Sequence, residues 1–285
     1  MLKYIGIHVQ PIYIIATKSN YTLWIRTAIE MLNIVMITSK LMAEIEYEEK
    51  NFVKTKEGTL PILLTCPHNG TQSPVPKRTG SNLPAECQFV TEPDEFTSDV
   101  TDGVAEKIFA LTNEWPYVVK FDVHRECIDV NREKKCGCEV LEAETYFDAY
   151  HSAIAQFAQE IRTNNTCHRL VLLFDIHGKD NDTSNISVGT RNKSTIQPIV
   201  KRNPGWGWDY KFGLISLLIK KGYTISPGSP CQEDDPEFFG GYTVKEHGGW
   251  QFEIANSKRQ PGDDQDRLID SLGNIIHKFY KHNCI

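Results

Sequence analysis

The chain contains four short apolar runs, and a polar cluster lies at or near the end of each. The runs are Leu60 to Leu64, Tyr117 to Phe121, Leu170 to Phe174 and Trp250 to Ile254. Their length and their content of branched and aromatic residues are typical of strands that are covered on both faces. Between them, apolar residues recur at helical spacing over residues 100–111 and 146–161. This alternation predicts an α/β domain with one central sheet.

The polar clusters indicate where a site should form. They are Pro67-His68-Asn69-Gly70, Asp122 to Arg132, Asp175-Ile176-His177-Gly178, and Gln251-Phe252-Glu253 within the last run. In open α/β sheets, ligands bind in the crevice beyond the carboxyl ends of the strands. We therefore expect these residues to meet in one crevice although they are far apart in sequence.

Length and charge restrict the class of protein. A chain of 285 residues can form one large core, and we expect one main domain over residues 60–285, with residues 1–59 packed on it or extending it. The net charge is -6, without a long block of Lys or Arg, so nucleic acid is not an expected partner. No run approaches the roughly 18 uninterrupted apolar residues of a membrane span, so a membrane is not expected either.

The cysteines and one possible N-glycosylation site are informative about the cellular location of the protein. The eight cysteines lack the compact spacing of a disulfide framework, so we expect reduced thiols and a cytoplasmic protein. A glycan on Asn69-Gly70-Thr71 would block a site beside His68, which agrees with that location. Cys66 and Cys127 lie next to proposed site residues, and Cys136-Gly137-Cys138 can in principle bind metal. Thiol chemistry is nevertheless less favoured, because Cys is commonly a small buried apolar residue.

Two histidines predict a metal site. A catalytic zinc ion takes three protein ligands from His, Asp or Glu and leaves a fourth position for water. His68 and His177 supply two imidazoles, and both follow strand-like runs. For the third ligand we favour Asp99, at the start of a helix, although an Asp there can also be a helix cap. Asp102 and Asp175 are the alternatives. The sequence thus predicts one Zn2+ per chain.

Glu253 is the predicted general base. A carboxylate on an apolar strand is costly unless it is paired or catalytic. As a base, it can take a proton from zinc-bound water and pass it to the leaving nitrogen. The alternative is a structural ion pair with Arg125 or Arg132. Because guanidinium groups bind carboxylates bidentately and polarise carbonyls, Arg125, Asn131 and Arg132 predict a small-molecule or short-peptide substrate with a carboxylate.

Together these motifs resemble the N-formylglutamate amidohydrolase family, which is similar in turn to the zinc carboxypeptidases and the aspartoacylase group. Ser187 to Arg191 and Phe239 to His247 also match, so the resemblance covers about residues 60 to 260. It implies a zinc carboxypeptidase-like fold, with a mixed central sheet flanked by helices, and amide hydrolysis by zinc-activated water. By similarity, the metal histidines are His68 and His177, the catalytic residues are Glu253 and Arg125, and the substrate-binding residues are Asn131, Arg132, Tyr242 and Arg191.

Two departures from the family pattern matter. Carboxypeptidases place a ligand Glu three residues after the first histidine, where this chain has Thr71, so the third ligand must come from beyond the following insertion. Gly178 follows the second histidine, where the family usually has Ser. The leading hypothesis is a zinc amidohydrolase for an N-acyl, N-formylglutamate-like amino acid. The alternatives are a zinc peptidase that trims peptides and a non-catalytic zinc-binding module. The loop from Pro227 to Gly249 is the expected lid.

Overall fold

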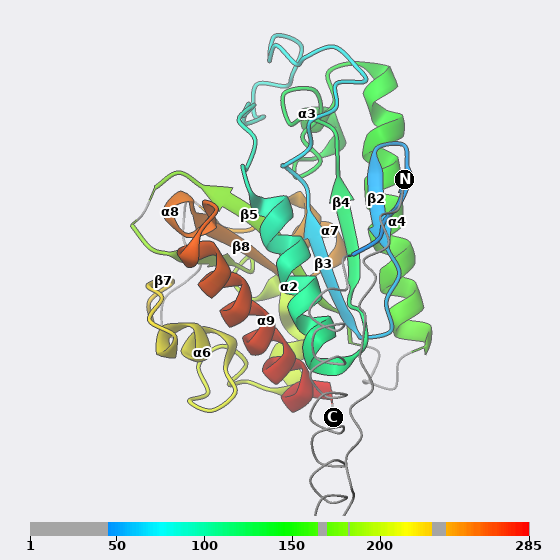
Figure 1. Ribbon diagram of the computed structural model, residues 1–285. Coiled ribbons are helices and arrows are strands. Elements are labelled where there is room, and N and C mark those ends of the chain that lie inside the picture. Colours follow the sequence, from blue (N-terminus) through cyan, green and yellow to red (C-terminus); the bar gives the residue numbers. More distant parts are fainter. Residues whose placement is uncertain (1–44, 165–169, 182, 230–237, 285) are drawn as a thin grey trace, which may run out of the picture. The chain divides into compact units, whose positions relative to one another are not determined.

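One mixed sheet organises this computed structural model, which describes residues 45–164, 170–181, 183–229 and 238–284 (Figure 1). Within the described residues the strand order is β1-β2-β4-β3-β5-β8-β6-β7. The strands are β1 (Glu48–Lys50), β2 (Val53–Lys56), β3 (Ile62–Cys66), β4 (Tyr117–Phe121), β5 (Leu172–Lys179), β6 (Ile186–Gly189), β7 (Ile225–Ser226) and β8 (Trp250–Ala255).

The four central strands are parallel and correspond to the four predicted runs. β3 pairs with β4 and β5, and β5 pairs with β8, all in parallel register. Every residue of β3, β4 and β8 is buried. The antiparallel pairs are β1 with β2, β2 with β4, and β6 with β8. The predicted α/β fold with a mixed central sheet flanked by helices is therefore confirmed.

Helices cover both faces of the sheet (Figure 1). One apolar core joins the sheet to α2 (Thr97–Thr112), α6 (Leu214–Lys220) and α9 (Asp263–Cys284), and a second joins it to α4 (Leu141–Asn164). Ile62 and Leu64 belong to the first core and Leu63 to the second, because successive strand residues point to opposite faces. The short helices are α3 (Lys134–Gly137), α5 (Gln197–Arg202), α7 (Tyr242–His247) and α8 (Asn256–Arg259), with a 3-10 turn at Ser194–Ile196.

Two insertions leave the sheet at the carboxyl ends of β3 and β4 and lie against each other. Gln72 donates its N–H to the carbonyl of Asp122 at 2.8 Å, and His124 donates to the carbonyl of Gln72 at 2.7 Å. A Cβ on Gly70 would lie 2.2 Å from the carbonyl carbon of Asp122, so only glycine allows this close approach. The insertions therefore form one wall at the ligand end of the sheet.

A disulfide joins these insertions, so the prediction of reduced thiols is wrong. Cys87 and Cys136 are bonded across 49 residues of sequence, with their Cα atoms 5.4 Å apart. Cys284 is also disulfide-bonded, whereas Cys66, Cys127 and Cys138 are free. Scattered spacing did not reveal the pair because only the folded insertions bring the two residues together. Since disulfides form in oxidising environments, the cysteines no longer support a cytoplasmic location, which stays a prediction.

Removing this disulfide is expected to destabilise the domain. Closure of a loop of this length restricts the unfolded chain, so Cys87→Ser should lower the free energy of unfolding by about 2–4 kcal/mol. Denaturant unfolding of the wild type, Cys87→Ser and Cys138→Ser measures the effect. Cys138 is free, so its variant should keep a midpoint close to that of the wild type. If the denaturant midpoint of the wild type does not change when a reductant is added, the disulfide is absent from the protein.

Two further predictions concern the N-terminal segment and membrane-spanning helices. Of the predicted segment 1–59, residues 1–44 lie outside the described part of the chain, and β1 and β2 add an antiparallel edge to the sheet. Among the described helices, none combines the length and the apolar character that crossing a membrane requires.

Candidate metal centre and active site

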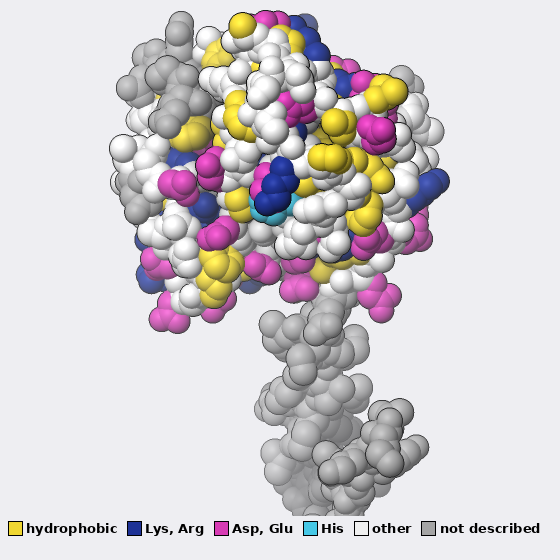
Figure 2. Space-filling view, turned by 90° about the horizontal axis from the view of Figure 1, so that it is seen from above, with side chains coloured by type: hydrophobic (Ala, Val, Ile, Leu, Met, Phe, Trp, Pro, Cys, Tyr) yellow, Lys and Arg dark blue, Asp and Glu magenta, His cyan; other side chains and the backbone are white. Residues whose placement is uncertain are grey.

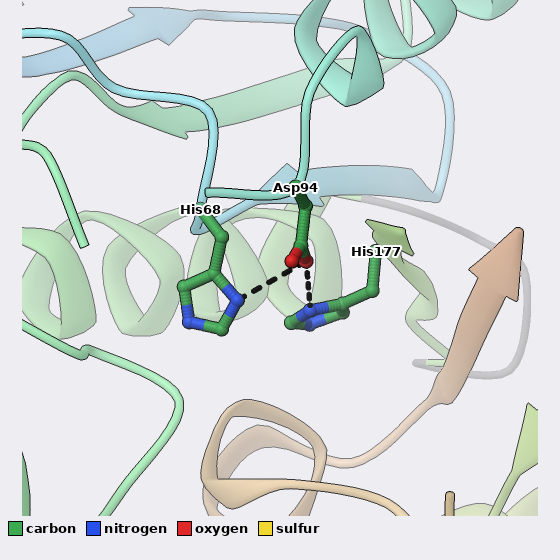
Figure 3. A group of neighbouring side chains, drawn as sticks. All are labelled: His68, Asp94 and His177. Atoms are coloured by element: carbon green, nitrogen blue, oxygen red, sulfur yellow. Dashed lines mark hydrogen bonds and ion pairs between the residues drawn. The ribbon is translucent and has the colours of Figure 1, made fainter. Parts of the chain in front are cut away.

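Three buried side chains from separate segments meet at the carboxyl end of the sheet (Figure 3). His68 follows β3, His177 lies on β5, and Asp94 lies in the insertion before α2. Oδ2 of Asp94 is 3.2 Å from Nδ1 of His68 and 3.0 Å from Nδ1 of His177. One donor atom from each residue lies within 4.8 Å of the others, which is close enough for all three to share one metal ion.

The backbone of the insertion holds Asp94 in this position. Asp94 donates its N–H to the carbonyl of His68 at 2.9 Å, which ties the insertion to the end of β3. The hydroxyl of Thr97 donates to the carbonyl of Asp94 at 2.6 Å at the start of α2. Asp94 therefore lies in the segment that leads into α2, three residues before Thr97, where the helix begins.

The third member of the cluster is thus Asp94 and not the predicted Asp99. Asp99 is exposed in the first turn of α2. Asp102 accepts hydrogen bonds from Tyr47 and from Lys120, the latter at 2.6 Å. Asp175 contacts the other nitrogen of His177, away from the centre of the cluster. The insertion contains several acidic residues, and nothing in their spacing distinguishes Asp94 from its neighbours.

Each histidine is held by a second buried carboxylate. Nε2 of His68 is 2.8 Å from Oδ1 of Asp129, and Nε2 of His177 is 2.8 Å from Oδ2 of Asp175. Both carboxylates are fully buried. A carboxylate behind an imidazole keeps the proton on Nε2 and directs the lone pair of Nδ1 toward a metal. The same arrangement thus appears at both histidines.

The chemistry of these donors fits a divalent cation such as zinc. When both Nε2 atoms carry their protons, the two Nδ1 atoms and Oδ2 of Asp94 are three acceptors that face one another. Such a group requires positive charge between its members. Protons can supply it, and a metal ion that displaces these protons can supply it as well. Two imidazoles and one carboxylate are a ligand set that catalytic zinc uses.

The electrostatics of the cluster agree with a cation site. Burial raises the pKa of Asp94, but the imidazoles of His68 and His177 outweigh burial and hold this pKa well below its usual value. Burial lowers the pKa of His177, but the contacts with Asp175 and Asp94 raise it well above the ordinary value. Asp94 is therefore an ionised carboxylate that attracts positive charge to both histidines.

Glu253 lies on β8 directly opposite His177 in the parallel register. Its carboxylate accepts a hydrogen bond from Nε2 of Gln251 at 2.6 Å, and its side chain is buried. Burial raises the pKa of Glu253 to about 7, with His177 opposing the shift and Asp94 adding to it. In the described part of the chain, Glu253 forms no ion pair with Arg125 or Arg132. The alternative interpretation of Glu253 as a structural ion-pair partner therefore has no support in the contacts.

Arg125 lies between the two carboxylates that surround His68. Its Nε donates to Asp129 at 3.1 Å, and its Nη1 is 3.3 Å from Asp94 and from the carbonyl oxygen of Glu92. The side chain is buried and lines the cavity beside the cluster. Arg125 thus orients the proposed metal ligands while its Nη2 remains for other contacts.

Arg132 and Arg191 differ from Arg125 because neither has a carboxylate partner among the described residues. Arg132 donates to the carbonyl of Asn131 at 3.2 Å and to Gln88 at 3.3 Å, and its buried Nε has no hydrogen-bond partner in the described part of the chain. Arg191 donates to the carbonyl of Gly240 at 2.9 Å. Arg132 is therefore the basic side chain of the cavity that is best placed to receive an anionic group.

The side chain of Asn131 is already engaged within the protein. Its Nδ2 donates to Gln251 at 3.2 Å and is 3.3 Å from Nε2 of His177, and its Oδ1 accepts the N–H of Thr243 at 2.9 Å. A Cβ on Gly241 would lie 2.1 Å from this amide, so glycine leaves the room that Asn131 fills. In this structure Asn131 connects β5, β8 and α7 and has little capacity left for a substrate.

A cavity of about 340 Å³ opens from the cluster. It is lined by His68, Asp94, His177 and Glu253 together with Arg125 and Arg132, and Phe238 to Gly241 of the expected lid form part of its wall. Residues 230–237 of that lid lie outside the described part of the chain. Figure 2 shows a histidine beside Lys or Arg side chains in the middle of one face of the molecule.

A second cavity of about 360 Å³ adjoins the first and shares Gln88, Arg132 and Gly240 with it. Tyr242 and Arg191 line this outer cavity and not the inner one. Tyr242 is the first residue of α7, and its ring packs against that of His151 in α4. Of the residues predicted to contact substrate, Arg132 therefore lines the cavity that holds the three-residue cluster, whereas Tyr242 and Arg191 line only the outer one.

No protein-family model matches the chain, and no curated protein matches it in sequence. Among solved structures, N-formylglutamate amidohydrolase from Ralstonia eutropha JMP134 is similar over 82% of this chain and 98% of its own, with 14% identity and a TM-score of 0.51. A gene product of Agrobacterium tumefaciens covers 81% of this chain and 92% of its own at 15% identity, with a TM-score of 0.48. A bacteriophage poly-gamma-glutamate hydrolase covers 81% and 89% at 15% identity, with a TM-score of 0.38. At these identities the likeness concerns the fold, which this chain shares with the Ralstonia amidohydrolase.

Proposed function

We propose that the chain is a zinc-dependent amidohydrolase that cleaves the amide bond of an N-acyl amino acid or a similar small substrate with a carboxylate. The observation that carries the proposal is the group of three buried acceptors, on His68, Asp94 and His177, in one cavity with the carboxylate of Glu253. When bound, a zinc ion supplies a Lewis acid that lowers the pKa of water and polarises a carbonyl.

Glu253 moves the protons in this proposal. Its pKa of about 7 is close to neutral pH, where a group can both accept and release a proton efficiently. It takes a proton from the attacking water and delivers it to the leaving nitrogen of the amide. Gln251 holds the carboxylate by a hydrogen bond, so its orientation is set before the substrate arrives.

The arginines orient the substrate in the same proposal. Arg132 lines the inner cavity, where no carboxylate of the described residues pairs with it, and it binds the carboxylate of the substrate. The contacts of Arg125 with Asp94 and Asp129 use Nε and Nη1. Nη2 is left to donate to the amide carbonyl as negative charge develops on its oxygen.

Replacing Arg132 is expected to weaken substrate binding more than it slows turnover. A charge-assisted hydrogen bond contributes about 1.5–3 kcal/mol, so Arg132→Ala should raise KM about 10- to 100-fold with a smaller change in kcat. Steady-state kinetics of Arg132→Ala beside Arg202→Ala, which removes an exposed arginine of α5, measures this difference. An unchanged KM in Arg132→Ala would assign carboxylate recognition to another residue.

Metal analysis and a substrate panel test the whole proposal. The purified chain should contain about one zinc ion and hydrolyse some members of a panel of N-formyl, N-acetyl and N-succinyl amino acids. Treatment with a chelator should abolish hydrolysis, and added zinc should restore it. A protein that binds no metal and hydrolyses these amides equally well after His177→Ala would exclude the proposal. Bound zinc without hydrolysis of any amide would favour a zinc-binding module.

The outer cavity favours one second candidate, a zinc peptidase that trims short peptides. Together the two cavities offer room for a substrate longer than a single acyl amino acid. The catalytic residues would be the same in both cases. Hydrolysis of di- and tripeptides with a higher kcat/KM than any acyl amino acid would identify this activity, and the reverse order would identify the amidohydrolase.

A further inference from the structure

A buried arginine, Arg259, connects the two segments that supply the proposed metal ligands. It ends the short helix α8, and its side chain is 3% exposed. Its Nε donates to the carbonyl of Glu95 at 2.8 Å, and its Nη1 donates to the carbonyl of Lys179 at 3.2 Å. Glu95 follows Asp94 directly, and Lys179 lies two residues after His177. One guanidinium therefore bridges the insertion that carries Asp94 and the strand that carries His177.

Among the described residues, two of the three hydrogen bonds of the Arg259 side chain go to these backbone carbonyls, and the charge of Asp94 also acts on the guanidinium. Its carboxylate neighbour Asp180 is 3.7 Å away and has a side chain that is 90% exposed, so this ion pair contributes little. The remaining hydrogen bond goes to Asn256 in the same helix, at 3.1 Å. A buried cation needs hydrogen-bond partners, and Arg259 finds them on the segments around the site. The planar fork of the guanidinium reaches the two carbonyls with two separate nitrogen atoms, a geometry that the single ammonium nitrogen of lysine does not reproduce.

Gly178 provides the room for this guanidinium. A Cβ built on Gly178 would lie 2.5 Å from Nε and 2.6 Å from Cζ of Arg259. Gly178 lies within β5 and does not have a positive φ, so its backbone does not require glycine. The missing side chain is therefore explained by the space that Arg259 occupies. Gly178 directly follows His177, so the space that Arg259 occupies also explains why this chain has glycine after its second histidine.

We propose that Arg259 is a positioning residue that sets the spacing between Asp94 and His177, and that Gly178 is required because the guanidinium fills the place of a side chain there. The inference rests on the proposed function in so far as this cluster binds zinc. Loss of the bridge should leave the three donors in place but allow the insertion to move relative to β5. Replacement of residues that orient metal ligands typically weakens metal binding about 10- to 100-fold.

Zinc affinity of the purified full-length chain, measured by competition with a chromophoric chelator, tests the proposal. Arg259→Gln should weaken zinc binding about 10- to 100-fold and change the visible absorption spectrum of the Co2+ form. Arg267→Gln removes a side chain that is 73% exposed, so it should bind zinc like the wild type. Gly178→Ala should weaken binding as Arg259→Gln does, because the added methyl group displaces the guanidinium.

The double variant distinguishes positioning from general damage to the fold. In Gly178→Ala with Arg259→Ala, no long side chain remains for the methyl group to displace, so the affinity should equal that of Arg259→Ala alone. If the losses of zinc affinity in the two single variants multiply in the double variant instead, the proposal is overturned. It is also overturned if Arg259→Gln keeps the wild-type zinc affinity and an unchanged Co2+ spectrum. If Arg259→Gln does not fold, Arg259→Lys replaces it, with a loss of about 10-fold expected and wild-type affinity as the contrary result.

The wild-type titration separates this inference from the proposed function. If the wild type binds no zinc, the proposed function fails, and the role of Arg259 in metal binding fails with it. If the wild type binds zinc and Arg259→Gln binds it equally well, only the inference about Arg259 is overturned.

Discussion

Glu253→Gln is expected to lower kcat by about 10²- to 10⁴-fold, the usual contribution of a general base. Glutamine has nearly the same shape, so the hydrogen bond with Gln251 and the packing of β8 should be preserved. Glu253 is not part of the three-residue cluster, so the variant should keep its zinc. Turnover and zinc content are measured on the same preparation. Glu246→Gln, which changes an exposed glutamate of α7, is the matched control and should behave like the wild type.

The pH dependence of turnover gives an independent check on the same residue. Burial raises the pKa of Glu253 to about 7, and the group acts as a base only when it is ionised. The rate should therefore fall about tenfold per pH unit below that pKa. A bound divalent cation lowers the pKa of a nearby carboxyl, so in the zinc form the fall should begin at or below pH 7. If Glu253→Gln retains wild-type turnover and the same pH profile, another residue is the base.

Asp94→Asn is expected to weaken zinc binding at least about 100-fold, whereas Asp99→Asn should leave it unchanged. Asparagine keeps the size of Asp94 but removes the charge that attracts a cation to His68 and His177. Zinc ligands are deprotonated groups, and a neutral amide oxygen is a much weaker donor. Because Asp99 is exposed in the first turn of α2, its variant is a close control in the same segment.

Equilibrium dialysis followed by metal analysis compares the two variants. Hydrolysis of the best panel substrate should fall with zinc content in Asp94→Asn and stay at the wild-type level in Asp99→Asn. The opposite result, with zinc lost only in Asp99→Asn, would restore the ligand that the sequence favoured. Equal zinc binding by both variants would place the metal outside the cluster of His68, Asp94 and His177.

The central strands are the part of the fold that could be predicted from the sequence. β4 has the predicted limits, Tyr117 and Phe121, and the ends of β3 and β8 lie within two residues of the predicted ones. β5 differs, because it continues five residues past the predicted end at Phe174, so His177 lies on the strand and not after it. These strands are buried on both faces, so their sequences are short continuous apolar runs, a pattern that is typical of central parallel strands. Because parallel strands end at the same edge of a sheet, the convergence of His68, His177 and Glu253 on one crevice was expected without coordinates. That β5 lies between β3 and β8, which places His177 beside both other residues, came only from the structure.

The residues on the insertions were much less predictable. Asp94 and Cys87 both belong to the segment after β3, which has no periodic pattern to set its path. Their partners, His177 and Cys136, are distant in sequence, so local propensity carries no information about either contact. The side chain of Asn131 illustrates the same limit. Its position after a strand suggested substrate binding, but its hydrogen bonds to Gln251 and Thr243 depend on a packing that spacing does not reveal.

The amino-acid sequence by itself determined the parallel core, the two histidines and the glutamate at its carboxyl end, because apolar runs are a local property of the chain and the carboxyl ends of parallel strands lie at one edge of a sheet. Only the tertiary structure decided that Asp94 completes the cluster, that Cys87 pairs with Cys136, and that Arg259 occupies the space beside Gly178. Each of these contacts joins irregular or distant segments, and their mutual approach depends on how the whole domain packs.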